Sequence, residues 1–173
     1  MSTLKVGTIQ STTGNTGLTI ANDGTTLPKA CAFSMLVNTG QSIPNTTDTQ
    51  VLFQVSNFDT NSIIDLSNNR VVITTATAGL WFLSFTTRFN LTTPYRHYNE
   101  IKKNGTSIAA FEQANYSQAA QAYQSCTVSG IFNLANADVL TFFVYHAYGS
   151  NRSFNIGNGN DSVRAEGFRV GTL

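Results

Sequence analysis

The chain has 173 residues, 11% of them charged, and a formal net charge of +1. This length predicts one domain with room for a short arm, and a domain of this size buries enough surface to need no disulfide or metal. The near-neutral balance excludes a strongly basic protein, so we expect neither nucleic acid nor a charged membrane surface as a partner. Asn, Thr, Ser and Gln replace the missing charges, as is common in secreted and virion β proteins.

The sequence shows neither a transmembrane segment nor a secretory signal. No apolar run approaches the roughly 18 residues that a transmembrane helix needs, so no membrane insertion is expected. The start, "MSTLKVGTIQ", has one Lys and no apolar h-region, unlike a secretory signal. We therefore expect synthesis in a cytoplasm and exit, if any, by another route. In that setting Cys31 and Cys126 are expected to be buried thiols, with a disulfide as the alternative.

Residues 1–30 differ from the rest of the chain. Two strand-like pieces, 4–10 and 17–22, flank the polar turn "STTGNT". The segment has too few apolar residues to fold alone, so it is either a loose tail or an extended arm that pairs with another protein. As an arm it would add a strand to a partner's sheet and place alternate side chains in pockets. The candidate attachment residues are Leu4, Val6, Ile9, Leu18 and Ile20.

From residue 31 onwards the pattern predicts β structure. The hairpin 98–111 has Asn104-Gly105 at its tip, the pair that a type I′ turn prefers. Only 112–124 has helical character, and its loose apolar spacing favours strand and loop. The remaining expected strands are 30–37, 49–59, 69–78, 77–90, 124–134, 138–148 and 162–173. Many short strands with turns between them predict an all-β sandwich or jelly roll of two antiparallel sheets.

Two of these strands are apolar on both faces, because successive residues point to opposite sides. In 77–90 one face carries Trp81, Leu83, Phe85 and Phe89, and the other carries Leu80 and Phe82 before it turns polar. In 138–148 one face carries Leu140, Phe142 and Val144, and the other Phe143 and Tyr145. A monomer rarely exposes so large an apolar patch. Either neighbouring chains or long loops of the same chain must cover the second faces.

No catalytic constellation is apparent. His97 and His146 stand alone in strands, which favours packing or surface roles, and no G-x-S-x-G, H-E-x-x-H or C-x-x-C motif occurs. The loop "NIGNGNDS" offers oxygens from Asn158, Asn160 and Asp161, which are weak calcium candidates. Calcium usually takes several carboxylates, and only Asp161 supplies one, so a surface loop is favoured. We expect no metal, no cofactor and no enzymatic activity.

The order of the strands carries a resemblance to a known family. "NNRVVITTATAGLWFLSF" resembles the signature of the globular head of complement component one q and its relatives, where a turn ending in Gly leads into an aromatic strand. "AFSMLV" is similar to the first strand of that family, "IKKNGTSIA" to its Lys-Asn-Gly hairpin and "VRAEGFRVG" to its last strand. Ala137-Asp138 stands where Gly-Asp is usual in the family. The resemblance covers residues 31–173 in the correct order.

This resemblance implies a ten-stranded jelly roll, shared with tumour necrosis factor, that assembles as a homotrimer. It implies an inner sheet containing 30–37, the "GLWFLSF" strand, "VLTFFVY" and "EGFRVG". One face of that sheet would pack on the neighbouring protomers. The expected trimer interface is then Leu80, Phe82, Leu140, Phe142 and Val144, with the opposite parity (Trp81, Leu83, Phe143) as the alternative.

No collagen-like repeat precedes the head, and "MSTLKVGTIQSTTG" resembles the amino-terminal opening of marine and cyanobacterial phage structural proteins. This implies a virion protein made in a host cytoplasm: a trimeric capsid decoration or cement protein, attached to other capsid or tail proteins through the arm 1–30, with the head at 31–173. The alternative is a receptor- or glycan-binding tip of a head or tail fibre, whose candidate sugar-stacking residues are Tyr95, Tyr98, Tyr116, Tyr123 and Tyr148. An enzyme on a jelly-roll scaffold is the least favoured interpretation.

Overall fold

The computed structural model describes residues 8–10, 16–20, 26–27, 31–89, 95–115, 124–156 and 163–172. The chain divides into two units, Met1–Ala30 and Cys31–Leu173. In the first unit the strands pair in the antiparallel order β1-β2-β3, with bounds Thr8–Gln10, Thr16–Ile20 and Thr26–Leu27. The sequence predicts an extended arm here, but β1 and β2 pair with each other and bring Ile9 opposite Leu18. This pairing lies within the segment, and its attachment to another protein stays a prediction.

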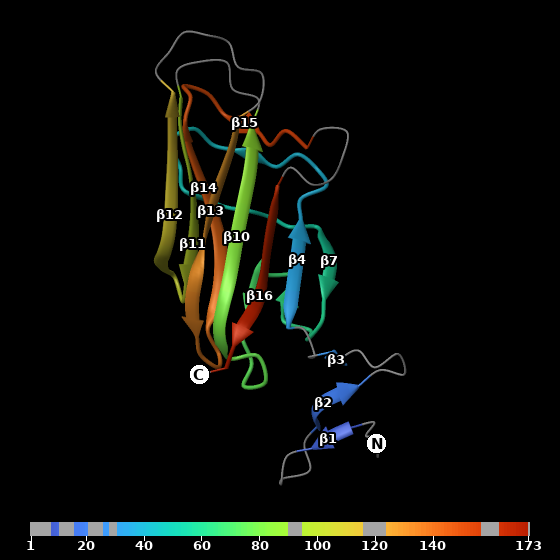
Figure 1. Ribbon diagram of the computed structural model, residues 1–173. Coiled ribbons are helices and arrows are strands. Elements are labelled where there is room, and N and C mark those ends of the chain that lie inside the picture. The colour runs from blue at the N-terminus through green and yellow to red at the C-terminus, as the bar shows by residue number, and fades with distance from the viewer. Residues whose placement is uncertain are drawn as a thin grey trace. The chain divides into compact units, whose positions relative to one another are not determined.

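The second unit contains a five-stranded antiparallel sheet in the order β13-β10-β16-β4-β7 (Figure 1). Its long central strand β10 pairs with β13 on one side and β16 on the other. The bounds are β4 Ala32–Leu36, β7 Val55–Asp59, β10 Gly79–Phe89, β13 Gln124–Leu134 and β16 Arg164–Gly171.

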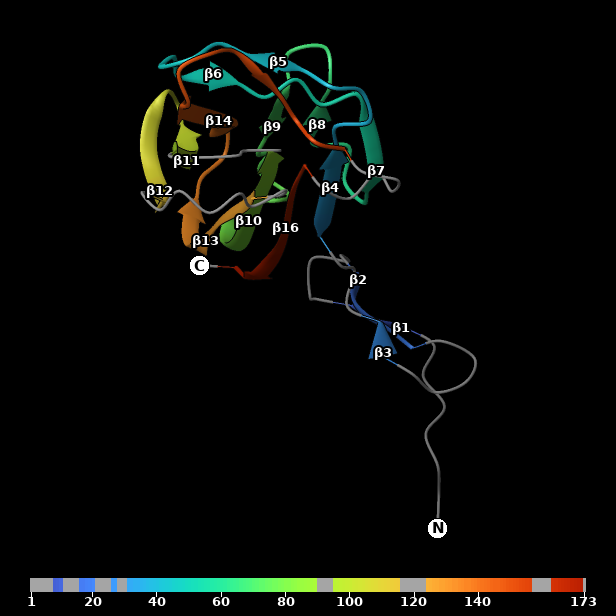
Figure 2. The same cartoon turned by 90° about the horizontal axis from the view of Figure 1, so that it is seen from above.

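A six-stranded antiparallel sheet lies over it as a second layer (Figure 2), in the order β12-β11-β14-β9-β8 with β6 paired to β14. A short ladder joins β5 and β15. The bounds are β5 Ser42–Ile43, β6 Thr49–Gln50, β8 Ile64–Asp65, β9 Arg70–Val72, β11 Tyr95–Lys103, β12 Thr106–Asn115, β14 Val139–Ala147 and β15 Arg152–Ser153. Every regular element in the described ranges is a strand, and within them no helix is long and apolar enough to cross a membrane.

The all-β sandwich predicted from the sequence is confirmed, but one sheet assignment was wrong. The family resemblance predicts the "VLTFFVY" strand beside the "GLWFLSF" strand in one inner sheet. In the structure β10 belongs to the five-stranded sheet and β14 to the six-stranded sheet, between β11 and β9. Alternation of apolar residues reports which side chains share a face, and it does not report which sheet a strand joins.

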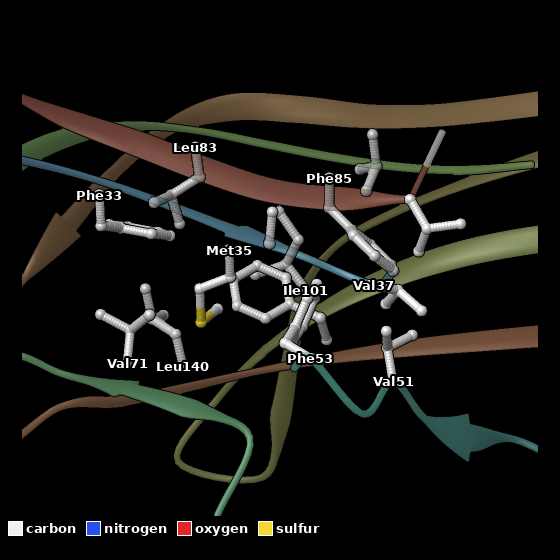
Figure 3. Close-up of a cluster of buried hydrophobic side chains, with 14 of the residues drawn as sticks. Phe33, Met35, Val37, Val51, Phe53, Val71, Leu83, Phe85, Ile101 and Leu140 are labelled. Atoms are coloured by element: carbon white, nitrogen blue, oxygen red, sulfur yellow. The ribbon is translucent and has the colours of Figure 1, made fainter. Parts of the chain in front are cut away.

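The core fills the space between the two sheets with side chains from alternate positions of facing strands (Figure 3). Phe142 of β14 contacts Phe85 of β10, with ring centroids 5.4 Å apart, and Phe53 edge-on at 5.7 Å. Trp81 is fully buried against Phe33, and its indole nitrogen donates to the Thr77 carbonyl at 2.8 Å. These aromatic contacts fix the spacing of the sheets and hence decide which side chains are left on the outer faces.

The hairpin between β11 and β12 turns at Asn104-Gly105, as predicted. Both residues have positive φ, 52° and 80°, which a type I′ turn requires. The Asn104 side chain also reaches the turn between β13 and β14: its amide donates to Asp138 at 2.7 Å, and its oxygen accepts from the Val139 N–H at 2.8 Å. The two turns at this end of the sandwich are therefore held together.

Ala137, in the turn between β13 and β14, adopts a φ of 68°. A residue with a Cβ pays roughly 1–2 kcal/mol in this left-handed region, whereas glycine adopts it freely. The resemblance noted above has Gly at this position, and the backbone conformation explains that preference.

We therefore expect Ala137→Gly to raise the free energy of unfolding by about 1 kcal/mol, because it relieves this strain. Urea denaturation followed by tryptophan fluorescence of Trp81 would measure the change. Ala110, an exposed residue of β12, provides the matched control. Ala110→Gly should lower stability by about 0.5–1 kcal/mol, because glycine weakens a strand. Equal effects of the two substitutions would contradict the strain argument.

A polar network lies inside the sandwich at the level of Thr87. The Thr87 hydroxyl donates its one proton to Asn99 Oδ1 at 2.7 Å, so it accepts from His97 Nε2, also at 2.7 Å. The Asn99 amide donates to the carbonyls of Cys126, at 2.8 Å, and Phe85. Because Thr87 lies on β10 and His97 on β11, the network joins the two sheets.

His146 lies directly opposite His97 on the neighbouring strand, and both side chains are fully buried. His146 Nε2 donates to the Ile43 carbonyl at 3.0 Å, and both imidazoles pack against the ring of Phe89. Their Nδ1 atoms find no hydrogen-bond partner within the described residues. Burial therefore lowers both pKa values, that of His97 from 6.5 to about 3.

The two cysteines are both buried and are not joined to each other in a disulfide, as the sequence analysis favoured. The Cys126 thiol donates to the Phe111 carbonyl at 3.3 Å. Burial raises its pKa to about 11, so the thiol stays protonated and unreactive at neutral pH.

The buried histidines predict that stability falls in mild acid. The unfolded chain takes up protons below pH 6.5, while the folded state holds His97 neutral down to about pH 3, so stability is lost throughout this window as the pH falls. The slope approaches about 1.4 kcal/mol per pH unit for His97 alone. Denaturant titrations between pH 6.5 and about pH 5 avoid most carboxylate protonation.

Because the chain has only two histidines, substitution isolates their contribution. His97→Gln should flatten the pH dependence in this range, whatever it does to stability at neutral pH. A slope unchanged in the double variant His97→Gln, His146→Gln would show that other groups cause the acid sensitivity.

Candidate functional site

The outer face of the five-stranded sheet, turned away from the core, changes character along its strands. On β10, Leu80 and Phe82 occupy this face at one end, and Ser84, Thr86 and Arg88 follow. The neighbouring strand β13 repeats the change, with Ile131 opposite Phe82 and with Ser129 and Thr127 opposite Ser84 and Thr86. The face thus has an apolar end and a hydroxyl-lined end.

At the apolar end four side chains from four strands form what we call the aromatic patch: Phe58, Phe82, Ile131 and Phe168. Phe82 and Phe168 lie side by side, with ring centroids 5.2 Å apart. The exposed fractions of Phe58, Ile131 and Phe168 are 46%, 62% and 51%. A hollow of about 170 Å³ opens between Phe58 and Phe168. Large apolar side chains gathered on one sheet face typically mark an interaction surface.

The hydroxyl-lined end has its own internal contacts. The Thr86 and Thr127 hydroxyls hydrogen-bond across β10 and β13 at 2.9 Å. Arg164 and Glu166, next along β16, form a partly exposed ion pair at 3.6 Å. Such pairs contribute little to stability, so the contacts described at this end are polar and weak.

The second apolar face of β14 is covered within the chain. Phe143 and Tyr145 point outward from the six-stranded sheet and are half-buried. The Lys102 ammonium lies 3.8 Å from the Phe143 ring centroid, and the ring of Tyr98 stacks on Tyr145 at 4.9 Å. Although burial disfavours the Lys102 ammonium, carboxylates of Asp48 and Glu100 outweigh it and raise its pKa.

The structure separates the residues that the sequence analysis assigned to the trimer interface. Leu80 and Phe82 do lie on the apolar end of the outer face, half-buried. Leu140, Phe142 and Val144 are fully buried in the core of one chain and have no exposed surface for a neighbour. Their assignment was a mistake that follows from placing β14 in the wrong sheet.

The alternative interface residues, Trp81, Leu83 and Phe143, do not form one surface either. Trp81 and Leu83 are fully buried in the core. Phe143 lies on the outer face of the opposite sheet, beneath Lys102. The side chains of β10 that could meet a partner are thus those of the Leu80 and Phe82 parity.

Three members of the aromatic patch escaped the sequence analysis: Phe58, Ile131 and Phe168. The signal for Ile131 was present, because it continues at steps of two the polar series Ser125, Thr127 and Ser129 on β13. An apolar residue at the end of an otherwise polar strand face is the pattern that β10 also shows. Phe168 carried the same signal, because it follows Arg164 and Glu166 at steps of two on β16, whereas Phe58 carried no comparable polar series.

Other predicted site residues lie partly beyond the described structure. The calcium candidates Asn158, Asn160 and Asp161 fall outside the described residues, as do Leu4 and Val6. Among the described ranges no group of three or more His, Cys, Asp or Glu side chains could hold a metal ion. Ile9 lies in β1, and Leu18 and Ile20 lie in β2.

A second hollow, the β11–β12 groove, lies over the other sheet. It has a volume of about 360 Å³ and is lined by Arg96, Tyr98, Glu100, Ala110, Phe111 and Glu112. The Arg96 guanidinium donates to both carboxylate oxygens of Glu112, at 2.8 and 2.9 Å, and holds the Glu112 pKa below its usual value. Burial raises the pKa of the Tyr98 phenol.

Comparison with solved structures identifies the fold. The chain is similar to Eiger, a tumour necrosis factor of S. frugiperda, at a TM-score of 0.61 and 10% identity, covering 84% of this chain and 96% of that one. It is similar to murine APRIL at a TM-score of 0.59 and 15% identity, covering 82% and 100%. The globular domain of a zebrafish complement 1qA protein aligns at 0.56 and 16% identity, covering 82% and 98%.

No family model and no curated protein matches the sequence. The structural likeness defines the class: the chain has the jelly-roll fold of the tumour necrosis factor and complement 1q proteins, as the ordered strand motifs implied. At these identities the likeness establishes the fold alone, because one fold supports many functions.

Proposed function

We propose that this protein is a non-enzymatic homotrimer and a structural component of a phage virion, where it decorates or cements the capsid. The observation that carries the proposal is the aromatic patch, where Phe58, Ile131 and Phe168 gather about half-exposed beside Phe82 on one sheet face. The resemblance of the amino-terminal residues to phage structural proteins supports the virion assignment. The jelly-roll fold is compatible with a trimeric protein that has no catalytic activity, and it supports the proposals of a homotrimer and of a non-enzymatic role.

The trimer is proposed from the jelly-roll fold, and the aromatic patch would serve it. In a ring each protomer presents one surface to the next protomer and a different surface to the previous one. The apolar ends of the three outer faces would meet around the axis, with the aromatic patch of each chain toward the centre. Because Phe58, Ile131 and Phe168 are already about half-buried in one chain, their full burial would gain roughly half of the about 1.5–3 kcal/mol that burying a fully exposed side chain of this size contributes.

We therefore expect a mass of three times 18.7 kDa in solution, measured by light scattering after size exclusion. Phe168→Asp should convert the trimer to monomers, because an unpaired charge buried in an apolar interface costs several kcal/mol. Phe168 is already half-exposed in one chain, so the substituted chain should still fold.

Leu52→Asp is the matched control for this substitution. Leu52 is a large apolar residue, 45% exposed, in the segment between β6 and β7. It lies outside the aromatic patch and should leave the trimer intact. A wild-type protein that remains monomeric at high concentration would refute the trimer, and a trimeric Phe168→Asp variant would place the interface elsewhere.

The amino-terminal unit is the proposed attachment element. Residues 2–27 would dock on a capsid or tail protein, with the strands β1 and β2 offering Ile9, Leu18 and Ile20 to the partner. Three copies on one trimer bind together, so a weak contact at each becomes strong overall through avidity.

Deletion of residues 2–27 should give a head that remains folded and trimeric but no longer attaches to particles. Cosedimentation of purified head with particles lacking the protein would measure attachment, and electron microscopy of intact particles would locate it on the capsid or the tail. Full occupancy by the truncated head would assign attachment to residues 31–173 instead.

A second function is favoured by the β11–β12 groove: a head that binds a host surface glycan at the tip of a head or tail fibre. The groove combines the ring of Tyr98, one of the tyrosines considered for sugar stacking, with fixed hydrogen-bonding groups. The two functions are compatible, because the groove and the aromatic patch lie on different sheets.

A further inference from the structure

We infer that the β11–β12 groove is a binding site for a neutral carbohydrate. This inference rests on the second function proposed above and names its ligand class and its residues. It does not depend on the aromatic patch or on the amino-terminal unit.

The shape of the groove follows from the side chains that alternate along β12. On the outer face of β11 stand Arg96, Tyr98 and Glu100, and the residues opposite them on β12 are Ala114, Glu112 and Ala110. The small alanines leave space between longer neighbours. The resulting volume of about 360 Å³ lies at the lower end of the range of about 300–1,000 Å³ for small-molecule sites.

The polar groups of the groove are held in place before any ligand arrives. The bidentate contact with Arg96 fixes the Glu112 carboxylate, and Glu100 accepts from the Lys102 ammonium at 3.1 Å. Each carboxylate oxygen retains acceptor capacity after one such contact. The groove can therefore accept hydrogen bonds from neighbouring hydroxyls of a ligand without rearranging, which lowers the entropic cost of binding.

The charge of the groove disfavours an anionic ligand. The carboxylates of Asp48, Glu100 and Glu112 face the two cations Arg96 and Lys102, so the cluster has one excess negative charge, and each cation is already paired. A phosphate, a sialic acid or a nucleic-acid backbone would be repelled by this excess negative charge. A neutral ligand rich in hydroxyls meets no such penalty.

The groove also has an aromatic wall. The Tyr98 ring stacks on Tyr145 of β14, and because β11 lies between β14 and β12, its other face turns toward the groove. A pyranose ring has an apolar C–H face and a hydroxyl edge. It can lay the first against Tyr98 and direct the second toward Glu100, Glu112 and Arg96, which is the combination of surfaces that these residues provide.

The test uses the full-length protein and a printed panel of neutral oligosaccharides of glucose, galactose, mannose and N-acetylglucosamine, with sialylated oligosaccharides beside them. The ligand that binds best is then titrated while the ¹³C-labelled methyl group of Ala110, in the groove, is followed by NMR. We expect binding of at least one neutral oligosaccharide, a shift of the Ala110 methyl resonance, and little change at high salt.

Two substitutions test the site in different ways, one by filling the groove and the other by removing a contact surface. Ala110→Arg fills the groove and Tyr98→Ser removes its aromatic wall, and each should weaken binding at least about tenfold. Leu52→Ser, a change of an exposed apolar residue outside the groove, should leave the affinity unchanged. Light scattering on every variant measures the molar mass, so a loss of the trimer is distinguished from a loss of ligand binding.

Three results would overturn the inference. They are a panel on which no neutral oligosaccharide binds, a neutral ligand whose affinity Ala110→Arg leaves unchanged, and binding confined to sialylated ligands and abolished by salt. In each case an intact trimer and intact attachment to particles would leave the structural function in place.

Discussion

The contact between Phe85 and Phe142 joins the two sheets, and the rest of the head is arranged around it. Each ring comes from the middle of a long central strand, so the pair fixes which alternate residues of β10 and β14 face inward. Strand geometry then leaves no freedom for the others: a side chain next to a core residue must point outward. The aromatic patch and the outer residues of β14 are therefore consequences of the same packing.

The two strands with apolar residues on both faces have different explanations. On β14 the outer face is covered by side chains of the same chain: Lys102 lies over Phe143, and Tyr98 stacks against Tyr145. On β10 the outer Phe82 meets Phe168, which is itself half-exposed, so the apolar surface widens. The same sequence pattern thus arises from an internal cover in one sheet and an open patch in the other.

This difference marks how far the sequence could predict the structure. The strands, the Asn104-Gly105 turn and the polarity change along β10 follow from local residues, because turn chemistry and alternation are local properties. The sheet to which β14 belongs depends on contacts with β11 and β9, far away in the chain. The interface assignment of Phe142 failed for that reason, while that of Phe82 matches an exposed face. The β11–β12 groove was equally out of reach, since it needs the pairing of Glu112 opposite Tyr98.

The row of Ser and Thr side chains beyond the aromatic patch has a consequence for any assembly built on this face. Hydroxyl groups that already bond to one another, as Thr86 and Thr127 do, neither repel a neighbouring chain nor hold it tightly, and they keep water close by. Three such faces around an axis would exclude water from the aromatic patches at one end and leave water between the hydroxyl-lined ends. Dissociation of the subunits would then begin at the hydroxyl-lined end and proceed toward the aromatic patches.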